Sequence, residues 1–239
     1  MATLLISDLH LDPARPAMVD AFERLLAGTA RDAEAVYILG DLFEAWIGDD
    51  DDAPIGAGVA DALGALSASG VDCAFQHGNR DFLLGEAFAN RCRLRLLPEA
   101  CVERIGGRDT LLMHGDSLCV DDLPYLAFRA QVRAPAWQAT FLGQSLAARR
   151  AFAAAARSES ARHTRGTAPV LMDVNHAAVV AALRRHGVGR IVHGHTHRPA
   201  IHTFAHDGEV AERIVLPDWY EQAAGLWIDE AGVRFAQFD

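Results

Sequence analysis

Short apolar runs alternate with amphipathic stretches along most of this chain. Runs rich in branched and aromatic residues predict buried strands at residues 2–7, 35–39, 71–76, 110–113 and 190–192. Helical spacing of apolar positions predicts helices near 17–27, 57–69 and 173–186, with Asp173 as a candidate N-cap of the last. Further strands separated by glycine turns are expected near 200–204, 212–216, 224–229 and 233–237. This order predicts an α/β fold in which mixed β-sheets are flanked by helices.

One segment departs from this pattern. Residues 123–172 are rich in alanine and arginine, with seven arginines and one acidic residue, in a chain whose net charge is −10. We expect a helical insertion that caps a single domain spanning residues 1–239, a length sufficient for a sizeable core. Its basic and apolar character suits an anionic amphiphile or an anionic membrane surface. A helical hairpin packed on the body, with solvated arginines, would produce the same composition.

The composition indicates the cellular compartment and argues against a membrane-spanning or secreted protein. The chain has no run of 18 or more apolar residues, which argues against a transmembrane helix. Its N-terminal stretch lacks a basic region and a cleavage pattern, so we expect a cytoplasmic protein and not a secreted one. The four cysteines are scattered, without a CxxC pair, and are expected to be reduced.

Acidic, amide and imidazole side chains follow the predicted strands. Because functional groups gather at the carboxyl ends of strands in α/β folds, we expect these side chains to share one crevice. Together they suit two divalent transition metals that share a carboxylate and position a hydroxide against phosphorus. The sequence therefore predicts a binuclear metal phosphoesterase. The seven residues are Asp8, His10, Asp41, Asn79, His114, His195 and His197.

These motifs differ in specificity. A DxH triplet or a lone histidine after a strand is common in proteins, whereas three histidines within HGHTHRP, residues 193–199, are rarely structural. The carboxylate run at 49–52 resembles a third metal site, but we expect it to be an exposed loop.

In this order the motifs resemble those of the calcineurin-like metallophosphoesterase superfamily, whose pattern is DxH, GDxx[ED], GNH[DE], a lone His and GHxH. The third block here is GNRD, with Arg80 in place of the usual histidine. Arginine stays protonated, so it can stabilise charge at phosphorus but is a poor general acid. A leaving group that needs no proton, such as a phosphate monoester leaving a pyrophosphate, is therefore favoured.

Longer blocks from residue 2 to about residue 199, including YILGDLFEAWIGDDD and MHGDSLCVDD, are similar to the UDP-2,3-diacylglucosamine pyrophosphatases of Gram-negative lipid A biosynthesis. This resemblance implies a manganese hydrolase that converts UDP-2,3-diacylglucosamine to UMP and 2,3-diacylglucosamine 1-phosphate (lipid X). It also implies that the helical insertion holds the acyl chains and that the protein is peripheral on the cytoplasmic face of the inner membrane.

Carried over residue by residue, the resemblance implies that one Mn²⁺ takes Asp8, His10, Asp41 and His197. The second Mn²⁺ would take Asp41, Asn79, His114 and His195, although Fe²⁺, Co²⁺ or Zn²⁺ suit the same donors. A bridging hydroxide would attack the α-phosphorus. Catalytic roles are then expected for Asp41, Asn79, Arg80, His114 and His195.

The same resemblance implies substrate contacts, made by Asn79, Arg80, Asp122, Ser160, Thr164, Thr167 and His195. At positions 164 and 167 the family often has asparagine and lysine, whereas this chain has threonine at both. A threonine hydroxyl supplies no charge, which makes Arg162 or Arg165 a candidate to replace the lysine.

Two other classes of function fit parts of the pattern. Another binuclear-metal phosphodiesterase could act on nucleotides or nucleic acid, but a nuclease should present a broad basic surface. Here a net positive charge is found in one apolar insertion, while the rest of the chain is acidic, so we expect no nucleic-acid partner. A non-catalytic scaffold would tend to lose ligands, and all seven are present. We expect the protein to be a monomer.

Overall fold

The computed structural model of the chain describes residues 2–166 and 173–239 and contains two mixed β-sheets. In the first sheet four parallel strands are extended by an antiparallel pair, in the order β11-β10-β1-β2-β3-β4. In the second the order is β5-β6-β7-β9-β8, and only β5 and β8 run antiparallel to their neighbours. This arrangement confirms the predicted fold class.

The first sheet consists of β1 (Thr3–Ile6), β2 (Ala35–Leu39), β3 (Asp72–Gln76), β4 (Arg95–Leu97), β10 (Ala224–Asp229) and β11 (Gly232–Gln237). The second consists of β5 (Ala100–Ile105), β6 (Arg108–Met113), β7 (Arg190–His193), β8 (Ala200–His206) and β9 (Glu209–Val215).

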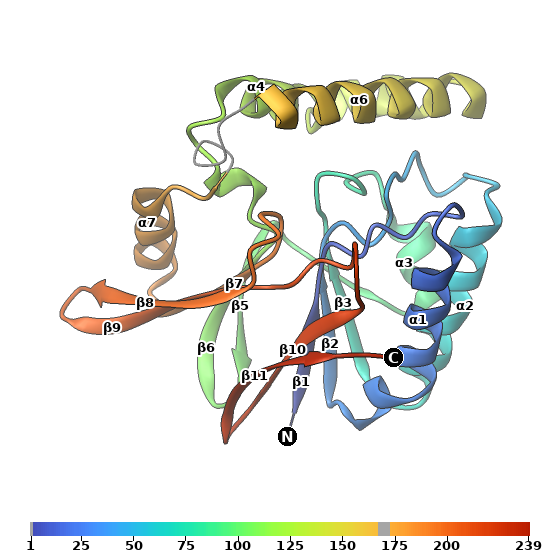
Figure 1. Cartoon of the computed structure of the whole chain (residues 1–239). Coiled ribbons are helices and arrows are strands. Elements are labelled where there is room, and N and C mark those ends of the chain that lie inside the picture. Colours follow the sequence, from blue (N-terminus) through green and yellow to red (C-terminus); the bar gives the residue numbers. More distant parts are fainter. Residues whose placement is uncertain (1, 167–172) are drawn as a thin grey trace.

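Helices cover the outer faces of the two sheets (Figure 1). Helices α1 (Pro16–Ala27), α2 (Pro54–Ala68) and α3 (Glu86–Cys92) cover the first sheet, and α7 (His176–His186) covers the second. Successive side chains of a strand point to opposite faces, so β1 directs Leu4 and Ile6 toward the helices and Leu5 into the core between the sheets. Both faces of these strands are buried, which explains their continuous apolar sequence.

Three further helices lie across one end of the sheets and are called the cap helices here (Figure 1). They are α4 (Leu123–Val132), α5 (Pro135–Leu142) and α6 (Leu146–Gly166). No helix in the described part of the chain is long and apolar enough to cross a membrane. All four cysteines are free thiols, as expected.

The boundary prediction for α7 was wrong. The cap is Asn175, whose side chain accepts hydrogen bonds from the backbone N–H groups of Ala177 and Ala178. Asp173 lies outside the helix and forms an ion pair with Arg198 at 2.8 Å. Asparagine and aspartate are equally good N-caps, so composition alone does not choose between them.

Candidate metal centre

Five of the seven predicted ligands have a left-handed backbone conformation. The φ angles of Asp8, His10, Asp41, His195 and His197 lie between 47° and 66°. Such a conformation is strained for a residue other than glycine and persists where the surrounding structure enforces it, often at functional sites. Asp8 and His10 therefore lie in tight turns after β1 and not on an extended strand.

The first group of ligands contains Asp8, His10 and His197. One donor atom from each lies within 4.8 Å of the other two. His197 Nε2 is 3.2 Å from Asp8 Oδ1, and His10 Nε2 is 3.8 Å from Asp41 Oδ2. The structure thus brings together the four side chains expected to hold the first ion.

The second group gathers around the side-chain oxygen of Asn79. This oxygen is 2.9 Å from His195 Nδ1 and 3.0 Å from His114 Nε2. His114 Nε2 also lies 3.7 Å from Asp41 Oδ1, so Asp41 presents one oxygen toward each group. One donor atom each of Asp8, Asp41 and His114 also lies within 4.8 Å of the other two.

The ionisation and hydrogen bonding of these side chains fit bound divalent ions. The buried Nε2 of His10 has no hydrogen-bond partner among the described residues. Burial raises the pKa of Asp8, but the hydrogen bond with His197 and the nearby His114 outweigh burial and hold that pKa well below its usual range. The Nδ1–H of His114 donates to the Leu39 carbonyl at 2.8 Å, which directs Nε2 at the centre. These side chains therefore form a donor set that fits a divalent metal centre.

Burial and charge also separate the pKa values of the two histidines around Asn79. Burial lowers the pKa of His114, but the carboxylates of Asp41 and Asp8 outweigh burial and raise it to about 9. Burial and the neighbouring His114 lower the pKa of His195 to about 4. His195 is therefore neutral at pH 7 and ready to act as a ligand, whereas His114 must lose a proton when an ion binds.

Residues around the ligands fix the loops that carry them. The fully buried Asp81 accepts hydrogen bonds from the backbone N–H groups of Gly78 and Leu42, at 2.9 and 2.7 Å, and so joins the loops after β3 and β2. A Cβ atom on Gly194 would collide with the Asp8 carboxylate. These positions hold in place the loops that carry the candidate ligands.

Sequence reasoning missed two residues beside the first ligand group. Glu44 Oε2 lies 3.0 Å from His10 Nδ1, and the Tyr220 ring stacks on the His10 ring at a centroid distance of 5.0 Å. Glu44 is the acidic end of the GDxxE motif and could have been found from it. Tyr220 lies in a loop after β9, with no motif to mark it.

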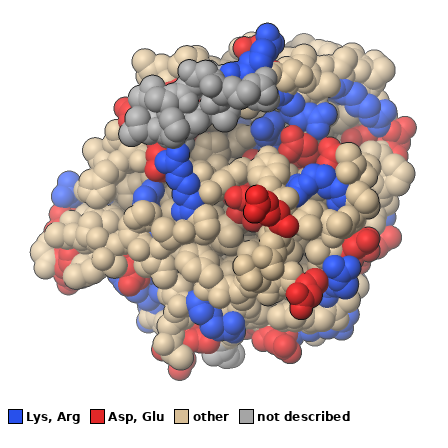
Figure 2. Space-filling model, in the orientation of Figure 1, with Lys and Arg blue, Asp and Glu red and all other residues tan. Residues whose placement is uncertain are grey.

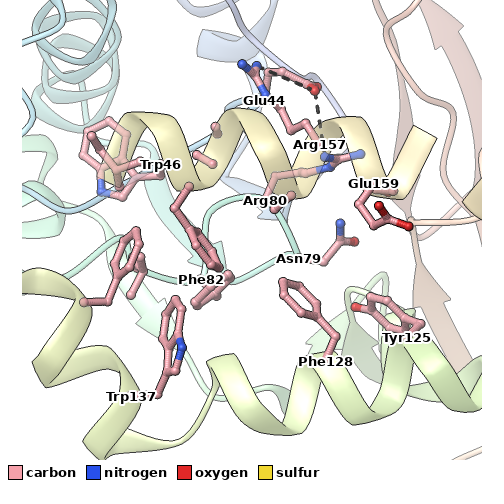
Figure 3. Close-up of a pocket in the computed structure, with 18 of the residues that line it drawn as sticks. Glu44, Trp46, Asn79, Arg80, Phe82, Tyr125, Phe128, Trp137, Arg157 and Glu159 are labelled. Atoms are coloured by element: carbon pink, nitrogen blue, oxygen red, sulfur yellow. Dashed lines mark ion pairs between the residues drawn. The ribbon is translucent and has the colours of Figure 1, made fainter. Parts of the chain in front are cut away.

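A cavity of about 310 Å³ leads away from the metal centre beneath the cap helices (Figure 3). Asn79, Arg80 and Tyr125 line one end. The rest is mainly aromatic, formed by Trp46, Phe82, Phe128, Trp137, Phe141 and Phe152. This combination of an apolar wall and a few polar groups at one end is typical of a site for an amphiphilic small molecule.

The other predicted substrate contacts have different outcomes. Ser160 lines the cavity, and Asp122 caps α4 by accepting a hydrogen bond from the Tyr125 N–H at 3.1 Å. The side chain of Thr164, the side chain of Arg165 and all of Thr167 lie outside the described residues. Arg162 is exposed and pairs with Glu159 on its own helix. The substrate contacts of Asp122 and Ser160 stay predictions.

The four carboxylates at 49–52 lie in a loop in which Asp50 and Asp52 are exposed, as predicted, and their side chains anchor this loop to the rest of the chain. Asp49 accepts hydrogen bonds from the Trp46 indole and from backbone N–H groups at the start of α3. Asp50 pairs with Arg149, and both Asp51 and Asp52 pair with Arg150. Arg149 is only 2% exposed, so this arginine is not solvated. Arginine and acidic atoms lie side by side near the cap in Figure 2.

The chain belongs to the calcineurin-like phosphoesterase family, whose model matches residues 1–199. This match confirms the family resemblance and the prediction of a hydrolase.

Two curated relatives are similar over nearly their whole length. The chain is 55% identical to UDP-2,3-diacylglucosamine hydrolase of Stenotrophomonas maltophilia (strain R551-3), over 97% of this chain and 96% of that protein. It is 52% identical to UDP-2,3-diacylglucosamine hydrolase of Xanthomonas oryzae pv. oryzae (strain PXO99A), over 100% and 99% of the two chains. Among solved structures, a novel archaeal phosphodiesterase aligns over 99% of both chains with 11% identity and a TM-score of 0.49.

Proposed function

We propose that this protein hydrolyses the pyrophosphate bond of UDP-2,3-diacylglucosamine, releasing UMP and 2,3-diacylglucosamine 1-phosphate for lipid A biosynthesis. The observation that carries the proposal is the aromatic cavity, which begins at Asn79 and Arg80 beside the metal centre and continues under the cap helices. An acylated sugar phosphate fits this cavity, because its acyl chains can pack against the aromatic wall and its phosphate can bind at the polar end. The names of the two relatives support this choice of substrate.

The chemistry requires little proton transfer to the leaving group. When bound, two divalent ions supply Lewis acidity and lower the pKa of water at the centre. Arg80 lines the cavity, and its buried Nε has no hydrogen-bond partner among the described residues, so its guanidinium can bind a phosphate oxygen. Water attacks the uridylyl (α) phosphorus, and the lipid phosphate leaves as an anion that needs no proton. Asn79 and His195 orient the reacting phosphate.

The metal assignment is part of the proposal. Asp8, His10, Asp41 and His197 would hold one Mn²⁺ ion, and Asp41, Asn79, His114 and His195 would hold the other. Mixed carboxylate, amide and imidazole donors suit Mn²⁺, with Fe²⁺, Co²⁺ and Zn²⁺ as competitors. Residues 123–172 form a cap within one domain of residues 1–239, and the protein acts as a monomer.

The cap helices also offer exposed apolar side chains through which the protein can reach a substrate embedded in a membrane. We propose a peripheral position on the cytoplasmic face of the inner membrane, without any nucleic-acid partner. Leu123 is 70% exposed on α4, and Phe128 and Leu142 are each 40% exposed on the cap helices, so they can contact lipid. Arg149 is buried against Asp50 and does not take part. Co-flotation with anionic vesicles measures this association, and the Leu123→Ser variant should weaken it.

Comparative kinetics test the proposed reaction. The Mn²⁺-loaded protein should hydrolyse UDP-2,3-diacylglucosamine far better than bis-p-nitrophenyl phosphate or cyclic AMP, with products followed by phosphorus NMR. Faster turnover of either simple diester would favour a general phosphodiesterase and overturn the assignment.

A further inference from the structure

Arg157 differs from the other arginines of the cap helices in how it is held. It lies on α6, and among the described residues it forms only long ion pairs, 3.5 Å from Asp12 and 4.0 Å from Glu44. Every other cap arginine with a described side chain has a hydrogen bond of 2.8 Å or shorter: Arg129, Arg133, Arg149, Arg150 and Arg162. Among these described arginines, Arg157 is therefore the one whose guanidinium can change partners at the lowest cost.

The partner of Arg157 is shared with Arg80. The two guanidinium groups approach the same oxygen, Glu44 Oε1, at 4.0 and 3.9 Å, and all three residues line the cavity (Figure 3). These distances exceed those of hydrogen bonds. A guanidinium group binds carboxylate or phosphate best through two parallel hydrogen bonds. Neither Arg80 nor Arg157 makes such a pair of hydrogen bonds with Glu44.

The position of Glu44 indicates that Arg80 and Arg157 can bind an anion beside the metal centre. Its second oxygen is 3.0 Å from Nδ1 of His10, so the carboxylate lies between the metal centre and the two arginines. The Glu44 carboxylate is thus an anion flanked by two cations at the polar end of the cavity. A pyrophosphate brings two phosphate charges to this place, and Arg80 alone can face only one of them.

We propose that Arg157 is a second phosphate-binding residue. When substrate binds, its guanidinium leaves Glu44 and Asp12 and binds the phosphate of the pyrophosphate that Arg80 does not face. The inference rests on the proposed function and adds a substrate contact from the cap. Phe152 and Ala156 line the apolar part of the cavity from the same helix. Because acyl chains would pack against α6, their binding would also fix the position of Arg157 on that helix. Binding energy from the remote acyl chains then helps to position the reacting pyrophosphate.

The test compares charge with packing at position 157. Arg157→Gln should lower kcat/KM for UDP-2,3-diacylglucosamine roughly 10- to 100-fold, the range of a lost hydrogen bond to a charged group. Arg157→Lys should recover part of this loss, whereas Arg157→Met should resemble the glutamine variant. The matched control is Arg150→Gln, because Arg150 lies on the same helix but pairs with Asp51 and Asp52. Bound metal and Tm should stay at wild-type values in all four variants.

Two results would overturn the role of Arg157. One is an Arg157→Gln variant within 2-fold of wild type, and the other is a methionine variant as active as the lysine variant, which would indicate packing. If the wild-type protein itself does not hydrolyse UDP-2,3-diacylglucosamine, the proposed function fails together with this inference.

Discussion

Gly194→Ala should damage the metal centre through a single added methyl group. Gly194 follows β7, and a Cβ atom at this position would lie well inside van der Waals distance of Ser7 Oγ and Asp8 Oδ2. The Asp8 carboxylate is fully buried and accepts a hydrogen bond from the His195 N–H at 2.9 Å. Restoring an ordinary contact requires a shift of about 1 Å, and misplacement of this size can reduce a catalytic rate about 100-fold.

Metal analysis and kinetics on the same samples measure this effect. After dialysis against Mn²⁺, the Gly194→Ala variant should retain less metal than the wild type and lose roughly 100-fold in kcat/KM. Gly64→Ala is the matched control, because it lies inside α2 and its nearest contact, the Arg91 carbonyl oxygen, is 3.5 Å away. The control should keep full activity and gain about 0.4–1 kcal/mol in unfolding free energy. Full metal content with wild-type kcat/KM in Gly194→Ala would refute the steric argument.

Three further predictions concern the centre and the cavity. Asp41→Ala should remove most bound metal and nearly all activity, and loss of one ion with substantial turnover would contradict a bridging role. UDP-N-acetylglucosamine should be a poor substrate, because each acyl methylene no longer buried forfeits roughly 0.8 kcal/mol; turnover comparable to the diacylated substrate would exclude the lipid-binding role of the cavity. Metal binding should release protons at pH 7 and weaken as pH falls, since the pKa of His114 in the metal-free protein is about 9. Calorimetry in buffers of different ionisation enthalpy detects this release, and identical heats would contradict it.

The strands, and the gathering of the candidate ligands at their ends, could be predicted because both depend on local sequence. Parallel strands buried on two faces have continuous apolar runs, and each predicted ligand follows such a run. The short elements α3, β4 and β5 were missed. Strand β4 has only three residues, and in β5 the apolar Val102 is exposed while the charged Glu103 is partly buried, so neither strand shows an apolar run or a clear apolar–polar alternation.

Contacts between distant segments explain the remaining differences. Arg149 looked like a solvated residue in a basic helix, but its partner Asp50 lies 99 positions earlier in the chain. Asp81 and Glu44 act by joining loops that only the folded sheet brings together. Local sequence also favoured Arg162 or Arg165 as the extra cation near the substrate. Arg162 is exposed and pairs with Glu159, whereas Arg157 reaches the cavity.

Hydrolysis of UDP-2,3-diacylglucosamine in ¹⁸O-labelled water tests the central claim most directly. Attack on the uridylyl phosphorus by water predicts that mass spectrometry finds one ¹⁸O atom in UMP and none in 2,3-diacylglucosamine 1-phosphate. Label in the lipid phosphate would contradict attack at the α-phosphorus, and the absence of both products would contradict the proposed reaction itself.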